Sequence, residues 1–294
     1  MSNHLPLLKH LQQQTGQKLD AAQPRPVGGG DINQAFHLQA PGVDWFLKLN
    51  RAALEDMFQA EAAGLRELAA EQCLNTPAVV TAGSFQQHAY LVLDFIPLRG
   101  LDSAGHAALG HGLAALHRRQ KDYFGWRRDN TIGATPQHNP RQTDWVIFWR
   151  EQRLGKQLQF AAANGYGGKL QTQGEKLCEQ VDAFFHAHQP HPSLLHGDLW
   201  GGNAAMDAAG QPVIFDPACY YGDRETDIAM TELFGGFGRE FYAAYQAEYP
   251  LERGYKTRKD LYNLYHILNH LNLFGGAYLS QAQHMISRLL AELG

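Results

Sequence analysis

An aspartate and an asparagine stand five positions apart in the segment LLHGDLWGGN, which occupies residues 194–203. Asp198 follows a short apolar run, and a carboxylate on a short loop can accept a proton from a hydroxyl group and orient its oxygen for attack. Asn203 could direct its carbonyl oxygen at a metal ion. The competing interpretation is an ordinary turn in which both side chains bond to neighbouring backbone groups.

A further aspartate, Asp216, ends the apolar run VIF eighteen positions after Asp198. A carboxylate at the end of a strand is a good ligand for a hard cation such as Mg²⁺. Asp227 stands eleven positions beyond Asp216, before the apolar segment IAM. It could cap a helix there, or it could reach back and hold the loop that carries Asp198.

Two charged residues interrupt apolar patterns earlier in the chain. Lys48 lies inside the strand-like segment WFLKLN, and Glu61 falls on the apolar stripe of a helix expected over residues 53–70. Because burial of an unpaired charge is costly, each residue needs a partner of opposite sign, and each could be the partner of the other. In the alternatives, Lys48 extends its stem to reach water, or Glu55 is its partner. Glu55 lies near the polar side of the stripe, so Glu61 is preferred.

Three consecutive glycines begin the segment GGGDIN at residues 28–33. Glycine allows backbone N–H groups to approach phosphate groups closely, so the segment is a candidate phosphate-binding loop. Taken alone, a glycine run of this kind more often marks an ordinary hairpin turn.

The elements that would position these residues begin with a small α+β part that ends near residue 97. Two strands are expected on either side of the glycines, with the helix over 53–70 later in the chain. The remaining expected elements are a short amphipathic helix over 4–14 and strands over 43–50 and 89–95.

After residue 98 the pattern becomes mainly helical, interrupted by two short apolar segments that carry Asp198 and Asp216. A polar segment rich in turn-forming residues, 130–144, is expected to be a surface loop. The expected helices cover residues 105–120, 145–158 and 174–188. The sequence therefore predicts two domains, residues 1–97 and residues 98–294.

The overall composition excludes several classes of protein. The chain has 294 residues, of which 44% are hydrophobic, and a net charge of −4, so it can bury a core and lacks the basic excess of a nucleic-acid-binding surface. Its three cysteines are widely spaced, which argues against a disulfide framework and for a reducing compartment. The N-terminus lacks the pattern of a signal peptide and no segment is apolar enough to span a membrane, so a cytoplasmic protein is expected.

In chain order, the glycine turn, the strand lysine, the helix glutamate, the D-x4-N loop and the strand-end aspartate are the parts used in kinase-type phosphoryl transfer. The chain resembles the fructosamine kinase (ketosamine-3-kinase) family, in the aminoglycoside-phosphotransferase branch of the protein-kinase-like fold. That fold is α+β with two lobes, a small N-terminal lobe for the nucleotide and a larger, mainly helical lobe for catalysis and acceptor binding. The segments that carry the likeness are GGGDIN, FLKLN, MFQAEAAGL, WVIFWREQRLGKQL, LLHGDLWGGN and FDPACYYGDRETDIAM.

The resemblance implies a role for each catalytic candidate. Asp198 would be the catalytic base, and Asn203 and Asp216 would hold Mg²⁺ on the phosphates of ATP. His196 and Asp227 would brace the loop that carries the base.

The resemblance also implies an ATP site and an acceptor side. Lys48 would contact the α- and β-phosphates and pair with Glu61, and backbone groups of Phe95 and Ile96 would face adenine. The residues implied for ATP binding are Gly28, Gly29, Gly30, Ile32, Lys48, Glu61, Phe95 and Ile96. The acceptor-side candidates, chosen for their closeness to the catalytic segments, are Trp200, Tyr220, Asp223 and Arg224.

Members of this family transfer the γ-phosphate of ATP to the 3-hydroxyl of ketosamines, including sugars attached to protein lysines, and later release of the amine reverses glycation. The resemblance therefore implies a kinase that uses ATP and Mg²⁺ on small ketosamines or glycated proteins, with no nucleic acid or membrane as partner and a monomer favoured. Two alternatives stay open. One is a phosphotransferase for another small hydroxylated amine, such as an aminoglycoside or choline, and the other is a pseudokinase that binds nucleotide without catalysis.

The sequence argues separately against a protein kinase. Ten residues separate Asp216 from Asp227, and the segment reads DPA rather than DFG, so there is no room for a long activation loop. Control by phosphorylation of such a loop is therefore not expected.

Three further positions carry expectations. Some family members have a cysteine directly after the three glycines, where this chain has Asp31, and we expect that carboxylate to turn away from the phosphates because they would repel it. The histidine-rich segment HAHQPH, residues 186–191, is expected to be an exposed helix end rather than a metal site. Cys219 is expected to be a structural cysteine.

Overall fold

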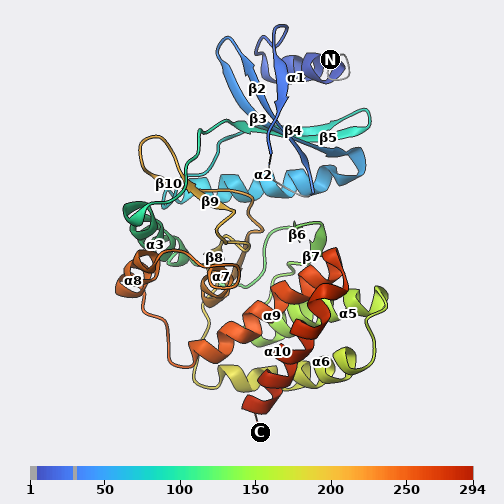
Figure 1. Ribbon diagram of the computed structural model, residues 1–294, viewed down its shortest axis with the longest axis vertical. Helices are drawn as coiled ribbons and strands as arrows, with labels where there is room; N and C mark the ends of the chain where they lie inside the picture. The colour runs from blue at the N-terminus through green and yellow to red at the C-terminus, as the bar shows by residue number, and fades with distance from the viewer. Residues whose placement is uncertain (1–4, 29–31, 294) are drawn as a thin grey trace.

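The computed structural model describes residues 5–28 and 32–293. Figure 1 shows an upper part built on a sheet and a lower part built mainly of helices, with the start of the chain at the top and its end at the bottom. The predictions made for Gly29, Gly30 and Asp31 lie outside the described residues.

A five-stranded antiparallel sheet forms the upper part. In the order in which they lie side by side, its strands are β1 (Gln23–Pro26), β2 (Gln34–Ala40), β3 (Val43–Arg51), β5 (His88–Asp94) and β4 (Val79–Phe85). Helix α1 (Leu5–Thr15) covers one face and helix α2 (Glu55–Ala70) lies against the other (Figure 1). The elements predicted before residue 97 are confirmed, and β4 is a strand that the sequence analysis did not predict.

Alternation along β3 explains why a lysine lies inside an apolar strand. Successive side chains of a strand point to opposite faces of the sheet. Leu47 and Leu49 belong to the core beneath α1, together with Leu11 of that helix. Lys48 therefore points to the other face, where α2 packs against side chains of β5 such as Leu91.

The lower part is mainly helical, and its core surrounds α9 (Tyr255–Phe274), in which every residue from 261 to 269 is buried. The other helices are α3 (Ser103–His117), α4 (Trp145–Phe148), α5 (Gly155–Ala163), α6 (Lys169–Glu179), α7 (Glu225–Thr231), α8 (Arg239–Glu248) and α10 (Leu279–Glu292). A π-helical segment, Trp149–Leu154, joins α4 to α5, and short 3₁₀ helices cover Ala52–Leu54, Val181–Phe185 and Gly276–Tyr278. The short strands are β8 (Ser193–Leu195), β9 (Ala204–Met206), β10 (Pro212–Ile214) and β11 (Tyr220–Gly222).

Residues 121–192 form an excursion of the chain that starts and ends at one place in the lower part. The backbone N–H of Lys121 donates to the carbonyl of Pro192 at 3.1 Å, and that of Leu194 donates to the carbonyl of Arg119 at 2.8 Å. Within this excursion, β6 (Asn130–Ile132) and β7 (Thr135–Gln137) form a hairpin that lies between α2 and α9 (Figure 1).

The prediction that residues 130–144 form a surface loop is wrong for 130–139, which contain the β6–β7 hairpin, and holds for 140–144, which are largely exposed. Asn130 and Gln137 are buried, and their amide groups donate to the backbone carbonyls of Cys219 and Ala218 at 2.9 and 3.1 Å. Polar side chains are tolerated inside a protein when their hydrogen bonds are satisfied. The polar side chains of this segment therefore bind backbone carbonyl groups of the residues just after Asp216.

Helix α2 belongs to the cores of both parts of the molecule. Phe58 and Leu65 pack beneath the sheet, whereas Ala63 and Leu68 belong to the core of the lower part. The domain boundary between residues 97 and 98 stays a prediction. Within the described ranges, no helix is both long and apolar enough to cross a membrane.

Candidate active site

The ammonium group of Lys48 lies between two carboxylates. Its Nζ atom is 2.6 Å from Glu61 Oε1 and 2.6 Å from Asp216 Oδ1, so β3, α2 and the end of β10 meet at this point. Burial alone would lower the pKa of Lys48, but the two carboxylates outweigh it and hold the pKa above its ordinary value. The predicted pairing of Lys48 with Glu61 is confirmed, because Glu55 instead accepts a hydrogen bond from Ser84 Oγ at 2.5 Å.

Asp216 has a backbone conformation that is rare for a residue with a side chain. Its φ angle is +57°, in the left-handed region, and such strain is characteristic of functional sites. The surrounding backbone holds this turn, since the Phe215 N–H donates to the Asn203 carbonyl at 3.1 Å and the Ala218 N–H donates to the His196 carbonyl at 2.9 Å. The Asp216 side chain is 46% exposed, so its carboxylate can also reach a cation from solution.

The loop that carries Asp198 is held by a buried carboxylate. Asp227, in α7, accepts hydrogen bonds from the backbone N–H groups of His196 and Gly197 at 2.7 and 2.8 Å. Gly197 has a φ angle of +83°, and a Cβ atom there would lie 2.1 Å from the carbonyl oxygen of Ala218, so glycine is required. The bracing contact predicted for Asp227 is confirmed.

His196 links the two segments that carry Asp198 and Asp216. Burial lowers the pKa of His196, so the ring is neutral. Its Nε2–H donates to the carbonyl of Phe215 at 3.0 Å, and its Nδ1 accepts a hydrogen bond from the Asp198 N–H at 3.3 Å. One neutral tautomer satisfies both bonds, and the bracing contact predicted for His196 is confirmed.

Two residues that the sequence analysis did not identify, His117 and Tyr245, hold the carboxylate of Asp227, with Tyr245 acting through His117. His117, the last residue of α3, lies 3.2 Å from Asp227 Oδ2 through Nε2, and its Nδ1 accepts a hydrogen bond from the hydroxyl of Tyr245 at 2.8 Å. Burial lowers the pKa of His117, so the neutral ring donates to Asp227. His117 lies on the same apolar side of α3 as Leu109 and Leu113. A histidine at such a position indicates that it has a buried hydrogen-bond partner, but the sequence does not show which residue that partner is.

Asp198, the candidate base, is held by Asn203. The Nδ2 atom of Asn203 donates to the backbone carbonyl of Asp198 at 2.9 Å and to its carboxylate Oδ2 at 3.3 Å. Burial, together with the negative charges of Asp216 and Asp227, raises the pKa of Asp198 to about 7. A carboxylate with a pKa near neutrality can take a proton from a hydroxyl group and release it again.

Asn203 and Asp216 offer the amide and carboxylate oxygens that Mg²⁺ prefers. Because the amide nitrogen of Asn203 is used by Asp198, the amide oxygen is left to face a cation. The hydrogen bond from the Phe215 N–H to the backbone carbonyl of Asn203 keeps the two candidate ligands on adjacent segments. The residues present therefore fit a divalent cation.

The structure restricts which backbone group of Phe95 could face adenine. The N–H of Phe95 donates to the carbonyl of Asp44 at 3.0 Å, so Phe95 can offer only its own carbonyl group. His37 stacks on Phe95 with ring centroids 3.7 Å apart and lies 2.5 Å from Asp44 Oδ1, which fixes the segment after β5 against the sheet. Contact of Ile96 with adenine stays a prediction.

Two residues of the glycine segment, Gly28 and Ile32, lie in the described ranges. Gly28 is exposed. The carbonyl of Ile32 accepts a hydrogen bond from Asn50 Nδ2 at 3.0 Å, and Ile32 Cδ1 would lie 3.2 Å from a Cβ atom at Gly133, in the β6–β7 turn. The segment therefore approaches the lower part, while the phosphate contacts of Gly28 and Ile32 stay predictions.

Three of the four acceptor-side predictions are wrong. Tyr220, Asp223 and Arg224 are buried within the lower part. Asp223 accepts a hydrogen bond from the hydroxyl of Tyr262 at 2.5 Å, and the guanidinium of Arg224 lies 3.7 Å from the ring centroid of Tyr249. Closeness in sequence to the catalytic segments misled the prediction, because β11 carries the chain into the core.

Trp200 stays at the surface, with 38% of its area exposed, and begins a row of rings two positions from the candidate base. Ring centroids are 6.4 Å apart between Trp200 and Phe234, and 4.7 Å apart between Phe234 and His270. His270 in turn lies 5.3 Å from Phe274 and 5.2 Å from Tyr278. We call these residues the aromatic row, and it leads from the Asp198 loop to the end of α9.

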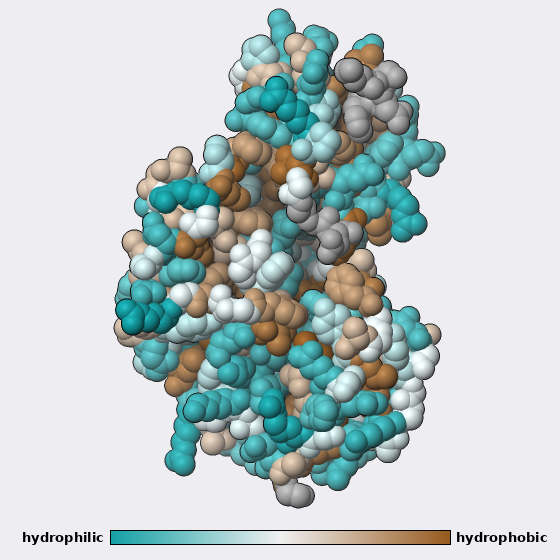
Figure 2. Space-filling view, viewed as in Figure 1, coloured by the Kyte–Doolittle hydropathy of each residue, from teal (hydrophilic) through white to brown (hydrophobic). Residues whose placement is uncertain are grey.

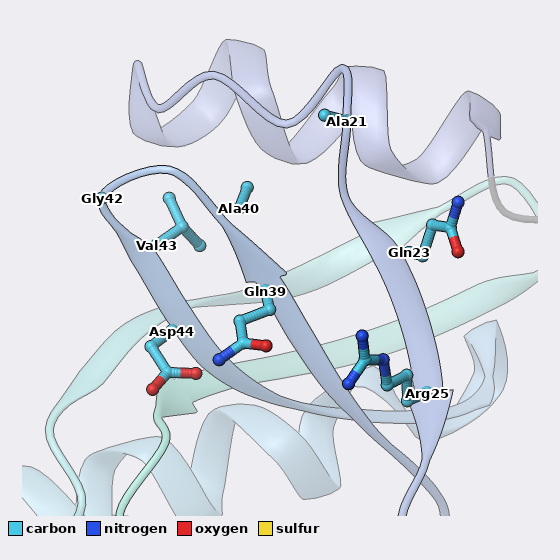
Figure 3. A pocket seen from close by; sticks show the side chains of 8 residues that line it. All are labelled: Ala21, Gln23, Arg25, Gln39, Ala40, Gly42, Val43 and Asp44. Carbon is cyan, nitrogen blue, oxygen red and sulfur yellow. The ribbon is translucent and has the colours of Figure 1, made fainter.

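The surface is hollowed between the two parts of the molecule and, separately, at the outer end of the sheet. In the space-filling view, hydrophobic and neutral side chains gather in the hollow between the upper and lower parts (Figure 2). A separate shallow hollow of about 630 Å³ lies at the outer end of the sheet, where Arg25, Gln39 and Asp44 line it (Figure 3). Lys48 and Asp198 do not line this second hollow, so its size does not locate the catalytic centre.

The prediction for the histidine-rich segment holds for His186 but is wrong for His188. His186 is exposed, whereas His188 is buried with Nδ1 2.7 Å from Glu252 Oε2 and Nε2 2.7 Å from Asp223 Oδ2. Each ring nitrogen lies within hydrogen-bond distance of a carboxylate, so the ring bridges two acidic residues. The carboxylates come from distant parts of the chain, which a search of the neighbouring sequence could not find.

Comparisons with known proteins agree with this geometry. The model of the fructosamine kinase family matches residues 5–292. A probable ketoamine kinase of Synechocystis sp. is 46% identical to this chain over 97% of this chain and 96% of its own length. A chloroplastic protein-ribulosamine 3-kinase of Arabidopsis thaliana is 42% identical over 91% of this chain and 82% of its own length.

Solved structures extend the comparison to the fold. A crystal structure of a candidate fructosamine-3-kinase from Haemophilus somnus matches with a TM-score of 0.88 and 32% identity, over 97% of this chain and 96% of that one. A thermostable mutant of the aminoglycoside phosphotransferase APH(4)-Ia, in complex with AMP-PNP and hygromycin B, matches with a TM-score of 0.62 at 15% identity over 98% of each chain, which shows a shared fold alone. The α+β, protein-kinase-like fold predicted from the sequence is confirmed.

Proposed function

Because the chain belongs to the fructosamine kinase family, we propose that it transfers the γ-phosphate of ATP to the 3-hydroxyl of a ketosamine. The observation that supports this most strongly is the placement of Asp198, whose pKa is about 7, beside the Lys48–Asp216 contact. A base that titrates near neutrality and a cluster of charges suited to phosphate and cation are the two needs of phosphoryl transfer to an alcohol.

The transfer itself is a displacement at phosphorus. A bond forms between the sugar oxygen and the γ-phosphorus, while the bond from that phosphorus to the bridging oxygen of ATP breaks and ADP leaves with the electron pair. The hydroxyl proton passes to the carboxylate of Asp198. Lys48, held by Glu61, orients the phosphates through its ammonium group.

Asn203 and Asp216 are the residues that would hold Mg²⁺. When bound, the cation would neutralise negative charge on the phosphates. His196 and Asp227 keep these ligands and the base in register through the backbone bonds described above.

The aromatic row supports a cationic, carbohydrate-bearing acceptor. The linking amine of a ketosamine carries a positive charge, and cations bind favourably over the faces of aromatic rings. Trp200 and Phe274 are both exposed, so the row is open to a free ketosamine and equally to a sugar carried on a protein lysine. We therefore include glycated proteins among the proposed substrates.

The proposal also includes a cytoplasmic, monomeric protein. The support for the cytoplasmic location is the state of Cys73, Cys178 and Cys219, all of which are free, as expected for a reducing compartment. Size-exclusion chromatography with light scattering would test the monomeric state.

The test is ADP release with Mg-ATP against ribulose-lysine, fructose-lysine, an aminoglycoside and choline, with Asp198→Asn as the control. We expect turnover on a ketosamine that is lost in the variant. Turnover only on the aminoglycoside or choline would assign a different acceptor. Binding of ATP without turnover on any member of the panel would support the pseudokinase instead.

A further inference from the structure

One side of α2 contacts the segment of residues 216–221 at three successive levels. Glu61, Gly64 and Glu67 stand three positions apart, so they are neighbours along the surface of the helix. Segment 216–221 begins with the candidate cation ligand and runs into β11.

The first two levels are an ion pair and a close approach. At the first, Lys48 lies 2.6 Å from Glu61 and 2.6 Å from Asp216. At the second, a Cβ atom at Gly64 would lie 3.2 Å from the sulfur of Cys219, so the side chain of Cys219 packs directly on the backbone of the helix. Cys219 is buried and its thiol pKa is raised well above the ordinary value by that burial, as expected of a structural cysteine.

The third level is formed by Glu67, which accepts two hydrogen bonds. Its Oε1 accepts from the hydroxyl of Tyr221 and its Oε2 from the indole N–H of Trp126, both at 2.8 Å. Tyr221 and Trp126 are each 2% exposed, so water does not offer either donor a ready alternative partner. The backbones of Gly125 and Tyr221 are joined by two hydrogen bonds of 2.9 and 2.8 Å, which fixes the two donors relative to each other.

We propose that Glu67 is a positioning residue for phosphoryl transfer. By binding Tyr221 and Trp126 it fixes α2 against segment 216–221, and it thereby sets the position of Glu61 and Lys48 relative to Asp216. Glu67 acts through these residues, and its Oε2 also lies 3.6 Å from Arg127 Nε at the surface. The inference rests on the proposed function for what is positioned, and it explains how an assembled site is maintained where no long activation loop exists.

The test compares Tyr221→Phe with Glu71→Gln. Tyr221→Phe removes one hydroxyl and keeps the ring. Glu71 lies four positions beyond Glu67 and pairs with Arg119 at 3.2 Å on the surface, so Glu71→Gln is a matched control. We expect Tyr221→Phe to weaken calorimetric binding of Mg-ATP about three- to tenfold and to lower kcat by a similar factor, with the KM for ketosamine unchanged. Glu71→Gln is expected to match the wild type in all three.

A second variant, Glu67→Gln, keeps the shape of the side chain and can still accept one hydrogen bond and donate another to the Tyr221 oxygen. We expect a smaller loss of Mg-ATP binding than in Glu67→Ala, so the pair of variants tests the same contact if Tyr221→Phe fails to fold. Lower thermal stability with unchanged Mg-ATP binding and unchanged kcat would overturn the proposal.

The calorimetric arm separates this proposal from the proposed function. Mg-ATP binding needs no acceptor, so a wild-type protein that binds Mg-ATP but phosphorylates no ketosamine would contradict the function and leave the role of Glu67 measurable in the same titration. A wild-type protein that does not bind Mg-ATP would overturn both.

Discussion

The ammonium group of Lys48 and the carboxylate of Asp216 lie 2.6 Å apart, although 168 positions separate the two residues in the chain. The contact joins β3 of the upper part to the end of β10 in the lower part. It brings together the residue proposed to orient the phosphates and a residue proposed to hold the cation. Glu61 contacts the same ammonium group, so its carboxylate and that of Asp216 together fix the position of Lys48 Nζ.

Replacing Glu61 by glutamine is expected to impair phosphate positioning. The side chain keeps its size but loses the negative charge that holds Lys48, so the ammonium group would be drawn toward Asp216 alone. We expect kcat/KM for ATP to fall about tenfold, equivalent to about 1.4 kcal/mol, in initial-rate measurements at saturating ketosamine. Glu55→Gln is the control, because Glu55 bonds to Ser84; equal losses in both variants would contradict the role given to Glu61.

The pKa of Asp198 predicts how the rate depends on pH. The carboxylate is the form that accepts the hydroxyl proton, and its pKa is raised to about 7 by burial and neighbouring charges. We therefore expect kcat/KM for ketosamine to rise about tenfold per pH unit below that pKa and to level off above it. A profile that stays flat between pH 5 and pH 8 would exclude Asp198 as a base with this pKa.

The same pKa predicts that Asp198→Asn stabilises the protein near neutral pH. The folded pKa of about 7 lies above the ordinary 3.8, so between these values the native state holds a proton that the unfolded chain has released. The free energy of unfolding therefore falls as pH rises through this window. Asparagine carries no such charge, and we expect a gain of about 1 to 3 kcal/mol at pH 7.5 that shrinks toward pH 4.5 in urea unfolding. A variant less stable than the wild type at pH 7.5 would refute this.

The residues that sequence could identify are those that break the pattern of their own element. Lys48 interrupts an apolar strand and Glu61 interrupts an apolar stripe, and each break is visible within a few neighbouring residues. Asp198 and Asn203 were identified by their spacing on one short loop. In each case the informative residues are close together in the sequence.

Burial set by distant contacts could not be predicted in this way. The polar neighbours of Asn130 favour a surface loop, but its hydrogen-bond partner is the carbonyl of Cys219, 89 positions away. The position of Asp223 just after the catalytic segments predicts a place beside the acceptor, yet β11 pairs with β8 and Asp223 is buried. The type of a residue determines which groups its side chain can bind, and tertiary packing determines which of these groups lies beside it.

Trp200 is expected to contribute to acceptor binding and not to ATP binding. Its ring is exposed at the start of the aromatic row, two positions from the base. We expect Trp200→Ala to raise the KM for ketosamine about three- to tenfold, with a smaller rise for Trp200→Phe and no change in the KM for ATP. Leu5→Ala, which removes an exposed apolar side chain on α1, is the control. An unchanged KM for ketosamine in Trp200→Ala would remove the aromatic row from the acceptor site.

The raised pKa of His188 predicts that the free energy of unfolding decreases at alkaline pH. Burial alone would lower the pKa of His188, but the carboxylates of Asp223 and Glu252 help to outweigh it and hold the pKa above its ordinary value of 6.5. The folded state therefore binds a proton more strongly than the unfolded chain does. This contribution to the free energy of unfolding is fully present below about pH 6.5 and is lost as pH rises through the folded pKa.

The measurement is urea unfolding of the wild type and His188→Gln at pH 6 and pH 9. We expect the variant to be less stable at pH 6 and the difference to narrow at pH 9, because the wild-type ring is then neutral and no longer attracts the two carboxylates by charge. His186→Gln is the matched control, since the side chain of His186 is 75% exposed in the same segment and its loss should not matter at either pH. A His188→Gln deficit of equal size at both pH values would mean that the ring stabilises the protein through packing and neutral hydrogen bonds, and not through its charge.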